Sequence, residues 1–477
     1  MKSFLNSKIL YSALGITLLV LLYSFYHRLI HVDDGILAEP TYFLLKDGVM
    51  RSDAFRGWWQ GEEKFIFTHK LYLYVGALFI AVFGWSAAAV KSVSLFYTIL
   101  LLGTWALAFK YLKLSKDYFL LFALLLLTNG HIYEFSFVYR PEIAVAFNGS
   151  LCLLFLNRYL KDLRWSDLLI AGFAASMAIG NHLNGVIIPG GGCILLLYHR
   201  RFLPFLIFGT IAATGFLFYL LGVHSMADFT LMINQFKHAQ DIGSEHGSIL
   251  HYLFNLIDEQ RRYLHSPKEI GFTLLFASSI FFARKTIWKD YRNSAIFTFG
   301  ACFFLALIAH GKTSKYLNIV IPLITFLTVV GLVDLLKKRP KVAVGLLCVF
   351  FVTQWMSNVH YTFTKDTTGR DYEELAGHLP PGTDFLAPED AVFWGVPKYR
   401  LQGFISYQFK EAHKHFAFTH EALGKALDTY SIDAVIFDPS NWKRYKMTEN
   451  ALSEFQLTKS VGIYRLFERK SKLVSEN

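Results

Sequence analysis

Two adjacent carboxylates, Asp33 and Asp34, stand directly after the first long apolar run of the chain. A charged side chain beside hydrocarbon costs about 2.5 kcal/mol or more on insertion scales, so such a pair needs a purpose. One purpose is chemical, because a carboxylate can accept a proton from a reacting hydroxyl. The other interpretation is a solvated loop that marks the membrane boundary. Residues 42–45 have near-helical apolar spacing and predict a short helix along the membrane surface.

The distribution of Lys and Arg between the loops places further polar residues on the same side of the membrane as this pair. They are His69, Lys70, Lys91, Arg140, Glu142, Asn181, His182, Lys312, Lys315 and Tyr316. A base beside fixed cations suits an acceptor hydroxyl that attacks a phosphate-activated substrate. The base removes the hydroxyl proton, and Arg or Lys stabilises the departing phosphate.

Structural interpretations of the same residues stay open. Arg140-Pro141-Glu142 is equally typical of a helix start, with Pro in the first turn and Glu at the positive end of the helix dipole. Lys312 and Lys315 are equally typical of side chains that reach toward an interface, and Tyr316 of an aromatic belt. The histidines of the set are more typical of structural positions. The sequence has no GxSxG, HExxH or CxxC arrangement, so hydrolase and zinc chemistry lack support.

The composition is that of a multi-pass membrane protein. The chain has 477 residues, of which 54% are hydrophobic and 17% aromatic. No single soluble core hides so many apolar runs of spanning length. The net charge of +11 does not indicate nucleic acid, because many Lys and Arg residues stand in short loops between apolar runs. The four cysteines lie in apolar runs without metal-ligand spacing.

About eleven transmembrane helices are predicted, and the first lacks a small-residue cleavage site, which indicates a retained helix. The predicted spans are 9–27, 88–109, 118–135, 142–157, 167–181, 186–198, 203–222, 270–283, 294–310, 317–335 and 342–357. The apolar run 71–84 is excluded by charge. With 71–84 on the surface, the loops of one side carry eighteen Lys and Arg, and the short loops of the other side carry three. Counting 71–84 as a span would place the most basic loops outside the cytoplasm, against the positive-inside rule.

This topology places three segments outside the cytoplasm. They are the loop at about 28–87 that carries the Asp pair, the loop 223–269 that is rich in His and charge, and the C-terminal 120 residues. The chain therefore divides into a transmembrane part, 1–357, and an external soluble domain, 358–477.

The external part is polar and has signals of both strands and turns. Pro380-Pro381-Gly382 predicts a turn, residues 433–437 a buried strand, and residues 459–468 a terminal strand. The predicted fold class is therefore an all-α multi-pass membrane protein with a small C-terminal α/β domain.

Five short motifs, taken in their order along the chain, carry a family resemblance. They are Asp33-Asp34 with Ala38-Glu39, Thr68–Tyr74, Phe83-Gly84 through Lys91-Ser92, Arg140-Pro141-Glu142, and Lys312–Leu317 with Pro322. They resemble, in that order, the Asp-Glu or Asp-Asp, K-P-P-L-Y-Y-W, F-G-x(4)-A-A-R-x-P-S, R-P-D/E and K-x-x-R-Y-L-x-P motifs of the GT-C glycosyltransferases. The most similar branch is that of the protein O-mannosyltransferases and the lipid A aminoarabinose transferases. The resemblance covers roughly residues 1–335.

The resemblance implies transfer of a sugar from a polyprenyl-phosphate monosaccharide to a glycan, lipid or protein acceptor. The transfer inverts the anomeric carbon and usually needs no metal, so no cofactor is expected. The resemblance implies that Asp33 is the base, supported or replaced by Asp34. The implied donor-phosphate-binding residues are Lys91, Arg140, Lys312 and Lys315. The candidates for substrate binding are Glu39, His69, Lys70, Glu142, His182 and Tyr316.

Three positions depart from the family pattern. Lys91 replaces an Arg, and a Lys offers a point charge where Arg offers a planar fork. Asp34 replaces the more common Glu, and His69-Lys70 replaces the usual Lys-Pro-Pro. The geometry of phosphate binding at 91 and the role of Lys70 are therefore in doubt.

The expected location is a bacterial inner membrane, with the active site facing the periplasm. The lipid bilayer, the lipid-linked donor and the acceptor are the expected partners, and nucleic acid is not. An alternative from another class is a transporter or flippase of lipid-linked sugars, with the charged residues along its pathway. The absence of an inverted repeat and the clustering of charge at one face favour the transferase.

Overall fold

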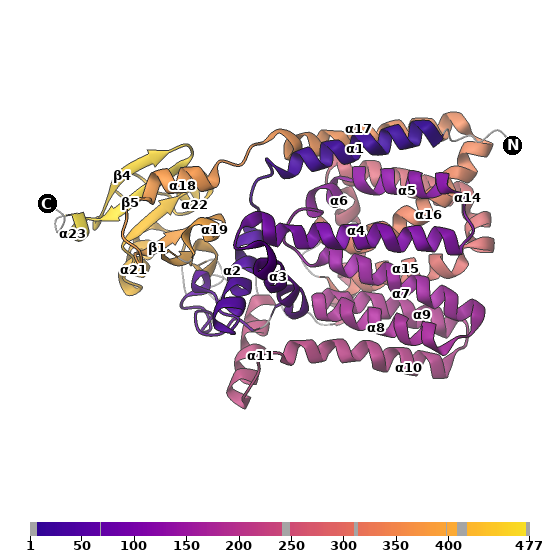
Figure 1. Cartoon of the computed structure of the whole chain (residues 1–477), viewed down its shortest axis with the longest axis horizontal. Coiled ribbons are helices and arrows are strands. Elements are labelled where there is room, and N and C mark those ends of the chain that lie inside the picture. Colours follow the sequence, from indigo (N-terminus) through magenta and orange to yellow (C-terminus); the bar gives the residue numbers. More distant parts are fainter. Residues whose placement is uncertain are drawn as a thin grey trace.

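A computed structural model gives the fold of the chain and describes residues 7–66, 68–240, 249–309, 313–396, 398–407 and 417–473. A bundle of long helices forms one end of an elongated molecule, and a small sheet with its helices forms the other (Figure 1). Helices α2 (Val32–Asp47) and α3 (Lys70–Phe83) lie between the two. The segment that contains α2 and α3 thus stands at the junction of bundle and sheet.

The helices of the bundle coincide with the predicted spans. They are α1 (Ser7–Phe25), α4 (Ala87–Tyr111), α5 (Lys116–Thr128), α7 (Glu142–Asp162), α8 (Trp165–Asn181), α9 (Ile187–Tyr198), α10 (Phe202–Ala213), α14 (Pro267–Asp290), α15 (Arg292–Ile308), α16 (Leu317–Lys338) and α17 (Pro340–Phe363). Within the described part of the chain, seven helical stretches are long and apolar enough to cross a membrane. The predicted spans on α5, α8, α9 and α15 fall on shorter helices, so a total of eleven crossings stays a prediction.

Helix α16 forms the centre of the bundle, and α1, α10 and α17 form its edge. In α16, 94% of the most apolar window is buried, whereas the corresponding share is 17% in α1 and 28% in the stretch that contains α10. Many of the side chains that α1 and α17 expose are apolar, among them Ile9, Leu19, Val352 and Met356. An apolar exterior around an apolar centre is what a lipid environment requires, because there is no aqueous drive to bury these side chains.

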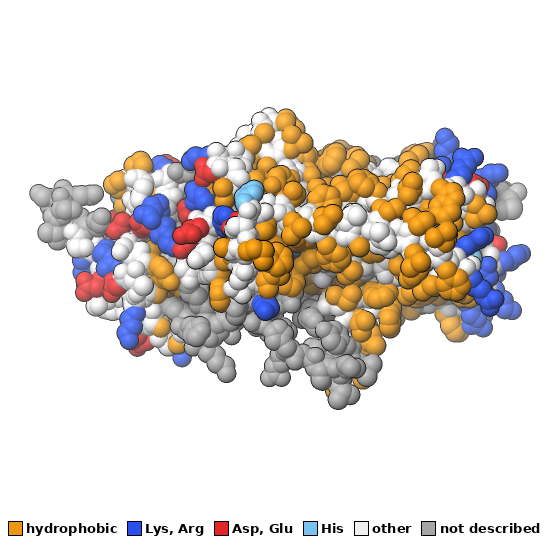
Figure 2. All heavy atoms as spheres, turned by 90° about the horizontal axis from the view of Figure 1, so that it is seen from below, with side chains coloured by type: hydrophobic (Ala, Val, Ile, Leu, Met, Phe, Trp, Pro, Cys, Tyr) orange, Lys and Arg blue, Asp and Glu red, His pale blue; other side chains and the backbone are white. Residues whose placement is uncertain are grey.

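Lys and Arg gather at the end of the bundle that is far from the sheet (Figure 2). The exposed residues there include Lys110, Lys113, Arg200, Arg201, Lys285, Lys289, Lys337 and Lys338. These residues belong to the loops that the charge pattern assigns to the cytoplasm. The α2–α3 segment lies at the opposite end of the bundle.

The helix expected at 42–45 is the second half of a longer helix, α2, whose first turn contains the Asp pair, so the alternative interpretation of the pair as a boundary loop was wrong. His31 caps α2, and its Nδ1 accepts a hydrogen bond from the Asp33 amide at 3.1 Å. The Asp34 carboxylate in turn accepts one from the His31 amide at 2.7 Å. This reciprocal capping box places both acids in the first turn, where the helix dipole favours negative charge. Pro40 concealed the helix, because proline normally interrupts one.

Helix α3 coincides with the run 71–84 and lies across the end of the bundle (Figure 1). It packs against α2 and α4 through Tyr72 and Leu73, which are fully buried, and exposes Leu78 and Val82. The predicted loop 223–269 also contains helices, namely α11 (Met226–Gln240), α12 (Ile249–Asp258) and α13 (Gln260–Leu264).

The C-terminal domain contains a five-stranded sheet of order β2-β1-β3-β5-β4. Its strands are β1 (Asp384–Ala387), β2 (Arg400–Gly403), β3 (Ala434–Phe437), β4 (Phe455–Val461) and β5 (Tyr464–Arg469). Strands β1, β2 and β3 are parallel, and β5 is antiparallel to both β3 and β4. The prediction of a single terminal strand at 459–468 was wrong, because the chain turns at Gly462, which has a φ of 54°. The domain's helices include α18 (Thr368–Ala376), α21 (His420–Thr429) and α22 (Pro439–Arg444).

The C-terminal domain docks on the segment that contains α2 and α3. Arg56 pairs with Asp384 at 2.6 Å, and the Trp85 indole donates a hydrogen bond to the Val396 carbonyl at 3.0 Å. Helix α2 packs against the short helix η6 (Glu389–Ala391) so closely that a Cβ on Gly35 would lie 1.9 Å from the Glu389 carbonyl oxygen. Because α17 continues to Phe363, we propose that the boundary between the two domains lies there and not at 357.

Gly35→Ala should loosen this docking. A methyl group at that position meets backbone atoms, and overpacking of this kind costs about 1–3 kcal/mol, which exceeds the gain in helix propensity. The thermal midpoint of the purified protein in detergent is therefore expected to fall. Gly15→Ala in α1 is the matched control, because nothing lies within 4 Å of its added methyl group. Equal midpoints for both variants would mean that the contact is not tight in solution.

Candidate active site

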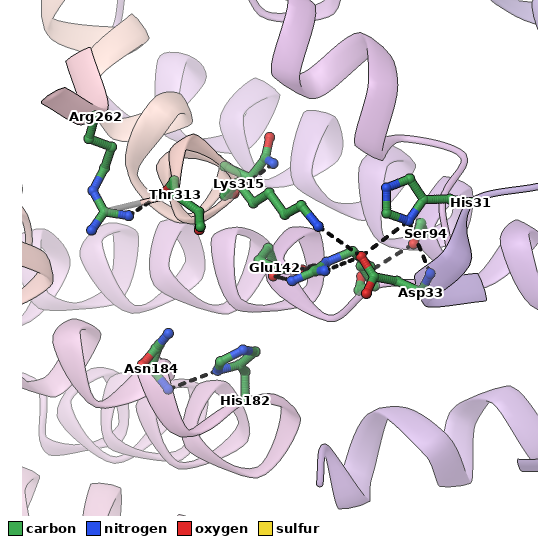
Figure 3. A network of polar contacts seen from close by, with 11 residues as sticks. His31, Asp33, Ser94, Glu142, His182, Asn184, Arg262, Thr313 and Lys315 are labelled. Atoms are coloured by element: carbon green, nitrogen blue, oxygen red, sulfur yellow. Dashed lines mark hydrogen bonds and ion pairs between the residues drawn. The ribbon is translucent and has the colours of Figure 1, made fainter. Parts of the chain in front are cut away.

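Asp33 lies at the centre of a charged network at the junction of bundle and sheet (Figure 3). Its Oδ2 contacts the Arg140 guanidinium, the Lys315 Nζ at 3.1 Å and the His31 Nδ1 at 3.1 Å. Its side chain keeps 20% of its surface exposed. Burial raises the pKa of Asp33, but Arg140, His31 and Lys315 together hold it well below the ordinary value. Asp33 is therefore an ionised carboxylate in reach of a ligand.

Arg140 stands between α6 (Gly130–Phe135) and α7, and two carboxylates share its guanidinium. Its Nε donates to both oxygens of Glu142 at 3.1 Å, and its Nη1 contacts Asp33. Glu142 is fully buried at the start of α7, so it fixes the guanidinium plane. The Ser94 hydroxyl donates to the Val138 carbonyl at 2.5 Å, which anchors the turn before Arg140. Arg140-Pro141-Glu142 is thus both the start of α7 and part of the charged network, so the two interpretations of this motif are compatible.

Lys315 reaches Asp33 from a different part of the chain. It lies on the short helix η5 (Ser314–Tyr316), directly before α16. The Arg262 side chain on α13 is fully buried and donates to the carbonyls of Thr313 at 2.6 Å and Ala309 at 3.1 Å. Arg262 therefore anchors both ends of the loop before Lys315. Lys312, the other expected phosphate ligand of this loop, lies outside the described residues.

Asp34 has a different environment from its neighbour. It is fully buried, and it accepts hydrogen bonds from the amides of Tyr139 at 2.5 Å and His31 at 2.7 Å. The Lys91 Nζ stands 3.8 Å away and donates to the carbonyls of Arg28 and Leu29 at 3.3 and 3.1 Å. These contacts tie α2 to the turn before Arg140. In place of the phosphate contact expected of Lys91, we propose that Lys91 and Asp34 position the segment around Asp33.

His69 and His182 lie with their ring centroids 4.5 Å apart, close to Arg140. Burial and the neighbouring positive groups lower the pKa of both imidazoles, that of His182 to about 3, so both are neutral. His69 has a φ of 30°, an uncommon value for a residue with a side chain, and such strain concentrates at functional sites. The Tyr316 ring lies 5.7 Å from His182. These three rings form an uncharged surface beside the cations.

Glu39 and Lys70, two further substrate-binding candidates, point to another segment. Glu39 binds the Ser52 hydroxyl and accepts a hydrogen bond from the Ala54 amide at 3.1 Å. The Lys70 Nζ lies 3.5 Å from the Met50 sulfur. Both side chains are fully buried, and burial raises the pKa of Glu39 to about 8 and lowers that of Lys70 to about 7. The Glu39 and Lys70 side chains therefore hold residues 50–54 in place, and neither contacts Asp33.

Glu39→Gln should alter the pH dependence of stability. The raised pKa means that the folded protein keeps a proton that the unfolded chain releases above about pH 4.5. Stability therefore falls as pH rises from about 4.5 to 8, and glutamine removes this contribution while it retains the hydrogen bonds. The thermal midpoint of the wild-type protein should fall more between pH 5 and pH 8 than that of the variant. Parallel midpoints across this range would contradict a neutral Glu39.

Two residues of the site, His31 and Arg262, were not predicted from the sequence. His31 contacts Asp33, and the spacing His-x-x-Asp of the capping box is a signal that points to it. Arg262 had no signal, because one Arg in the polar segment 223–269 resembles any solvated charge. Among the described residues, no three His, Cys, Asp or Glu side chains form a group that could hold a metal ion.

No protein-family model and no curated protein matches the chain. Among solved structures, ArnT from Cupriavidus metallidurans in the apo state is similar, with a TM-score of 0.61 and 12% identity over 98% of this chain and 99% of that chain. The same protein bound to undecaprenyl phosphate gives a TM-score of 0.62 and 13% identity, over 97% and 98% of the two chains.

An archaeal protein has a similar fold over most of the chain. The oligosaccharyltransferase AglB from Archaeoglobus fulgidus, in complex with an inhibitory peptide and a dolichol-phosphate, gives a TM-score of 0.53 and 11% identity. The match covers 90% of this chain and 69% of AglB. The predicted fold class is therefore confirmed, and the chain has the GT-C fold of membrane glycosyltransferases.

Proposed function

We propose that this chain is a membrane glycosyltransferase that transfers a monosaccharide, a hexose or a pentose, from a polyprenyl-phosphate donor to an acceptor hydroxyl. The observation that carries the proposal is one accessible carboxylate, Asp33, held between Arg140 and Lys315. The GT-C fold supports it, because the similar ArnT and AglB structures hold undecaprenyl phosphate and a dolichol-phosphate.

The proposed reaction uses each charged group of the network. Asp33 takes the proton of the acceptor hydroxyl, and the hydroxyl oxygen forms the new bond to the anomeric carbon. The bond between that carbon and the phosphate oxygen breaks, and the electron pair leaves with polyprenyl phosphate. Arg140 and Lys315 stabilise the negative charge that develops on the phosphate. Attack opposite the leaving phosphate inverts the anomeric carbon.

Donor binding should also strengthen the base. In the free protein the two cations hold the pKa of Asp33 low, and a carboxylate of low pKa is a weak base. A donor phosphate competes for Arg140 and Lys315, and their attraction for Asp33 weakens when they turn to it. The pKa of Asp33 then rises toward its ordinary range. Full basicity is thus reached when the donor is in place, which protects against proton abstraction without a substrate.

The direct test is product release from a purified sample. A donor labelled in its sugar, undecaprenyl-phosphate-linked, is incubated with the protein and membrane acceptors, and free undecaprenyl phosphate is measured. Turnover that disappears in Asp33→Asn supports the proposal. The transporter alternative predicts instead that intact donor crosses the bilayer of a vesicle without release of the phosphate. Movement without release would overturn the proposal.

The site is proposed to face away from the cytoplasm, in a bacterial inner membrane. The support is the collection of Lys and Arg at the opposite end of the bundle. A reporter enzyme fused after Asn477 should therefore be active only outside the cytoplasm, and a cysteine placed in 284–292 should react only from the cytoplasmic side. The reverse pattern would mean that the orientation of the chain is inverted or that the number of crossings before residue 284 is wrong by an odd number.

A further inference from the structure

A cavity of about 250 Å³ lies at the end of the bundle opposite the candidate active site. Its walls come from the end of α4, the last two turns of α7, and the turn between α14 and α15. Helix α7 begins at Glu142, beside Asp33, and its 21 residues span about 30 Å, the thickness of the hydrocarbon core of a bilayer. The cavity therefore lies at the other membrane interface, and the proposed mechanism assigns nothing to it.

The walls of this cavity carry an excess of positive charge. Lys161, Lys289 and Arg292 line it, and Asp290 is the acidic residue in its described wall. Among the described residues, none of the three cations is in an ion pair, so Asp290 offsets their charge only in part. Two positive charges remain in excess, and an anion is the ligand that would balance them.

A buried hydroxyl and a helix start indicate what kind of anion fits. The Tyr111 hydroxyl is shielded from solvent in the cavity wall and has no hydrogen-bond partner among the described residues. The Lys161 Nζ lies 5.1 Å from the centre of the Tyr111 ring. Helix α15 begins in the same wall without a side-chain cap, so its first amides add partial positive charge. Hydroxyl and amide donors beside Lys and Arg are the groups that bind phosphate oxygens.

A purely structural role explains the lysines but not the cavity. Lys161 and Lys289 stand in the last turns of α7 and α14, where a cation complements the helix dipole. That role needs neither a space between them nor the buried Tyr111 hydroxyl. Toward the core the packing closes, because the Trp105 and Phe326 rings stack 5.0 Å apart and leave about 10 Å³, room for about one water molecule. The cavity therefore admits a head group and not an acyl chain.

Two exposed tryptophans place the cavity at the level of lipid head groups. Trp288 directly precedes Lys289 and is 53% exposed, and Trp165 follows Lys161 by one turn and is 48% exposed. Tryptophan collects where hydrocarbon meets head groups. Lys and Arg gather at the same end of the bundle (Figure 2). Basic pockets between membrane helices at a cytoplasmic face are a known setting for anionic head groups.

We propose that this cavity binds the phosphate head group of an anionic phospholipid. Its volume is a little below the roughly 300 Å³ at which pockets for drug-sized ligands begin, which suits a head group alone. A zwitterionic lipid fits less well, because its ammonium group would add positive charge to a site that already has an excess. The bound lipid joins the ends of α4, α7 and α15 and is independent of the proposed transfer reaction.

The test is native mass spectrometry of the full-length protein in detergent, titrated with dioleoyl phosphatidylglycerol. The double variant Lys161→Gln/Lys289→Gln should weaken the tightest lipid binding at least about tenfold, because charge-assisted hydrogen bonds to phosphate are lost. Lys110→Gln/Lys285→Gln is the matched control. It removes the same charge from exposed positions at the same end of the bundle, outside the cavity wall, and should leave the affinity unchanged.

Two ligand arms separate the sources of the phosphate. Dioleoyl phosphatidylcholine should bind the wild type at least about tenfold more weakly, because the site selects net negative charge. Glycerol 3-phosphate and inorganic phosphate should not displace phosphatidylglycerol. Displacement by either would assign the cavity to a soluble phosphate, and equal affinity for the two lipids would mean that head-group charge is not selected. Equal loss in both double variants would assign the binding to diffuse surface charge. Each of these three results would overturn the proposal.

Tyr111→Phe keeps the test decisive if the double variant does not fold. It preserves the charge and the size of the wall and removes only the hydroxyl, so its thermal midpoint without lipid should match that of the wild type. Loss of one hydrogen bond to a charged phosphate should weaken binding of phosphatidylglycerol about threefold or more. Wild-type affinity in this variant would contradict a phosphate at the Tyr111 hydroxyl.

Discussion

Asp33→Asn is expected to lower sugar transfer by about 10²- to 10⁴-fold, the usual contribution of a positioned general base. Asparagine keeps the size of the side chain and part of its hydrogen bonding, but it cannot take the hydroxyl proton. Binding of undecaprenyl phosphate should persist or become tighter, because Arg140 and Lys315 lose their competing carboxylate. Turnover and binding are measured on the same detergent-purified samples.

Asp34→Asn is the matched control for this change. Asp34 accepts from two main-chain amides, and an Asn side chain would present an NH₂ group to one of them. Its main effect should therefore be a lower thermal midpoint, with transfer per folded molecule reduced much less than in Asp33→Asn. If Asp34→Asn proves the more damaging to turnover at equal folding, the base is Asp34. If neither change affects turnover, the proposed mechanism fails.

Arg140→Ala should lower turnover by about 10- to 100-fold or more, because one charge-assisted hydrogen bond to the leaving phosphate is worth roughly 1.5–3 kcal/mol. The variant also leaves the buried Glu142 without its cation, so part of the loss can come from folding. Arg140→Lys separates the two effects, because it keeps the charge and removes the planar fork. It should fold and still turn over more slowly than the wild type. Wild-type kinetics in both variants would return Arg140 to a helix-start role.

The pH profile gives an independent measure of the same network. Lys315 is one of the groups that hold the pKa of Asp33 low, so Lys315→Met should raise that pKa. A smaller fraction of Asp33 is then ionised in acid, and the acidic limb of kcat/KM moves to higher pH. Lys338→Met, at the opposite end of the bundle, is the control and should leave the limb in place. An unmoved limb in Lys315→Met would mean that this lysine does not act on Asp33.

The sequence predicted the long helices and the side on which the charged motifs gather. Hydropathy and the positive-inside rule depend only on composition along the chain, so the spans and their orientation can be predicted without a structure. The meeting of Asp33, Arg140 and Lys315 followed from their shared side. The start of α2 was not predicted, because a proline inside the helix outweighed the capping signal before it.

Which lysines reach the site could not be read from the sequence. Lys91 and Lys315 both stand near the end of an apolar run, but Lys91 turns inward to carbonyl groups and Lys315 turns to Asp33. The difference depends on the loop that each helix faces, which is a tertiary property. The same holds for Glu39, which stands in the same helix as Asp33 and yet binds another segment.

The contact between Gly35 and Glu389 has a practical consequence for engineered forms of this protein. Asp33 and Asp34 immediately precede this glycine, so the C-terminal domain contacts the helix that carries the proposed base. A chimera that takes its C-terminal domain from a relative should therefore also take α2 from that relative. Otherwise the contact at Gly35 changes, and we expect the position of Asp33 to change with it. Helix α2 and the sheet should therefore be exchanged together, even though about 340 residues of sequence separate them.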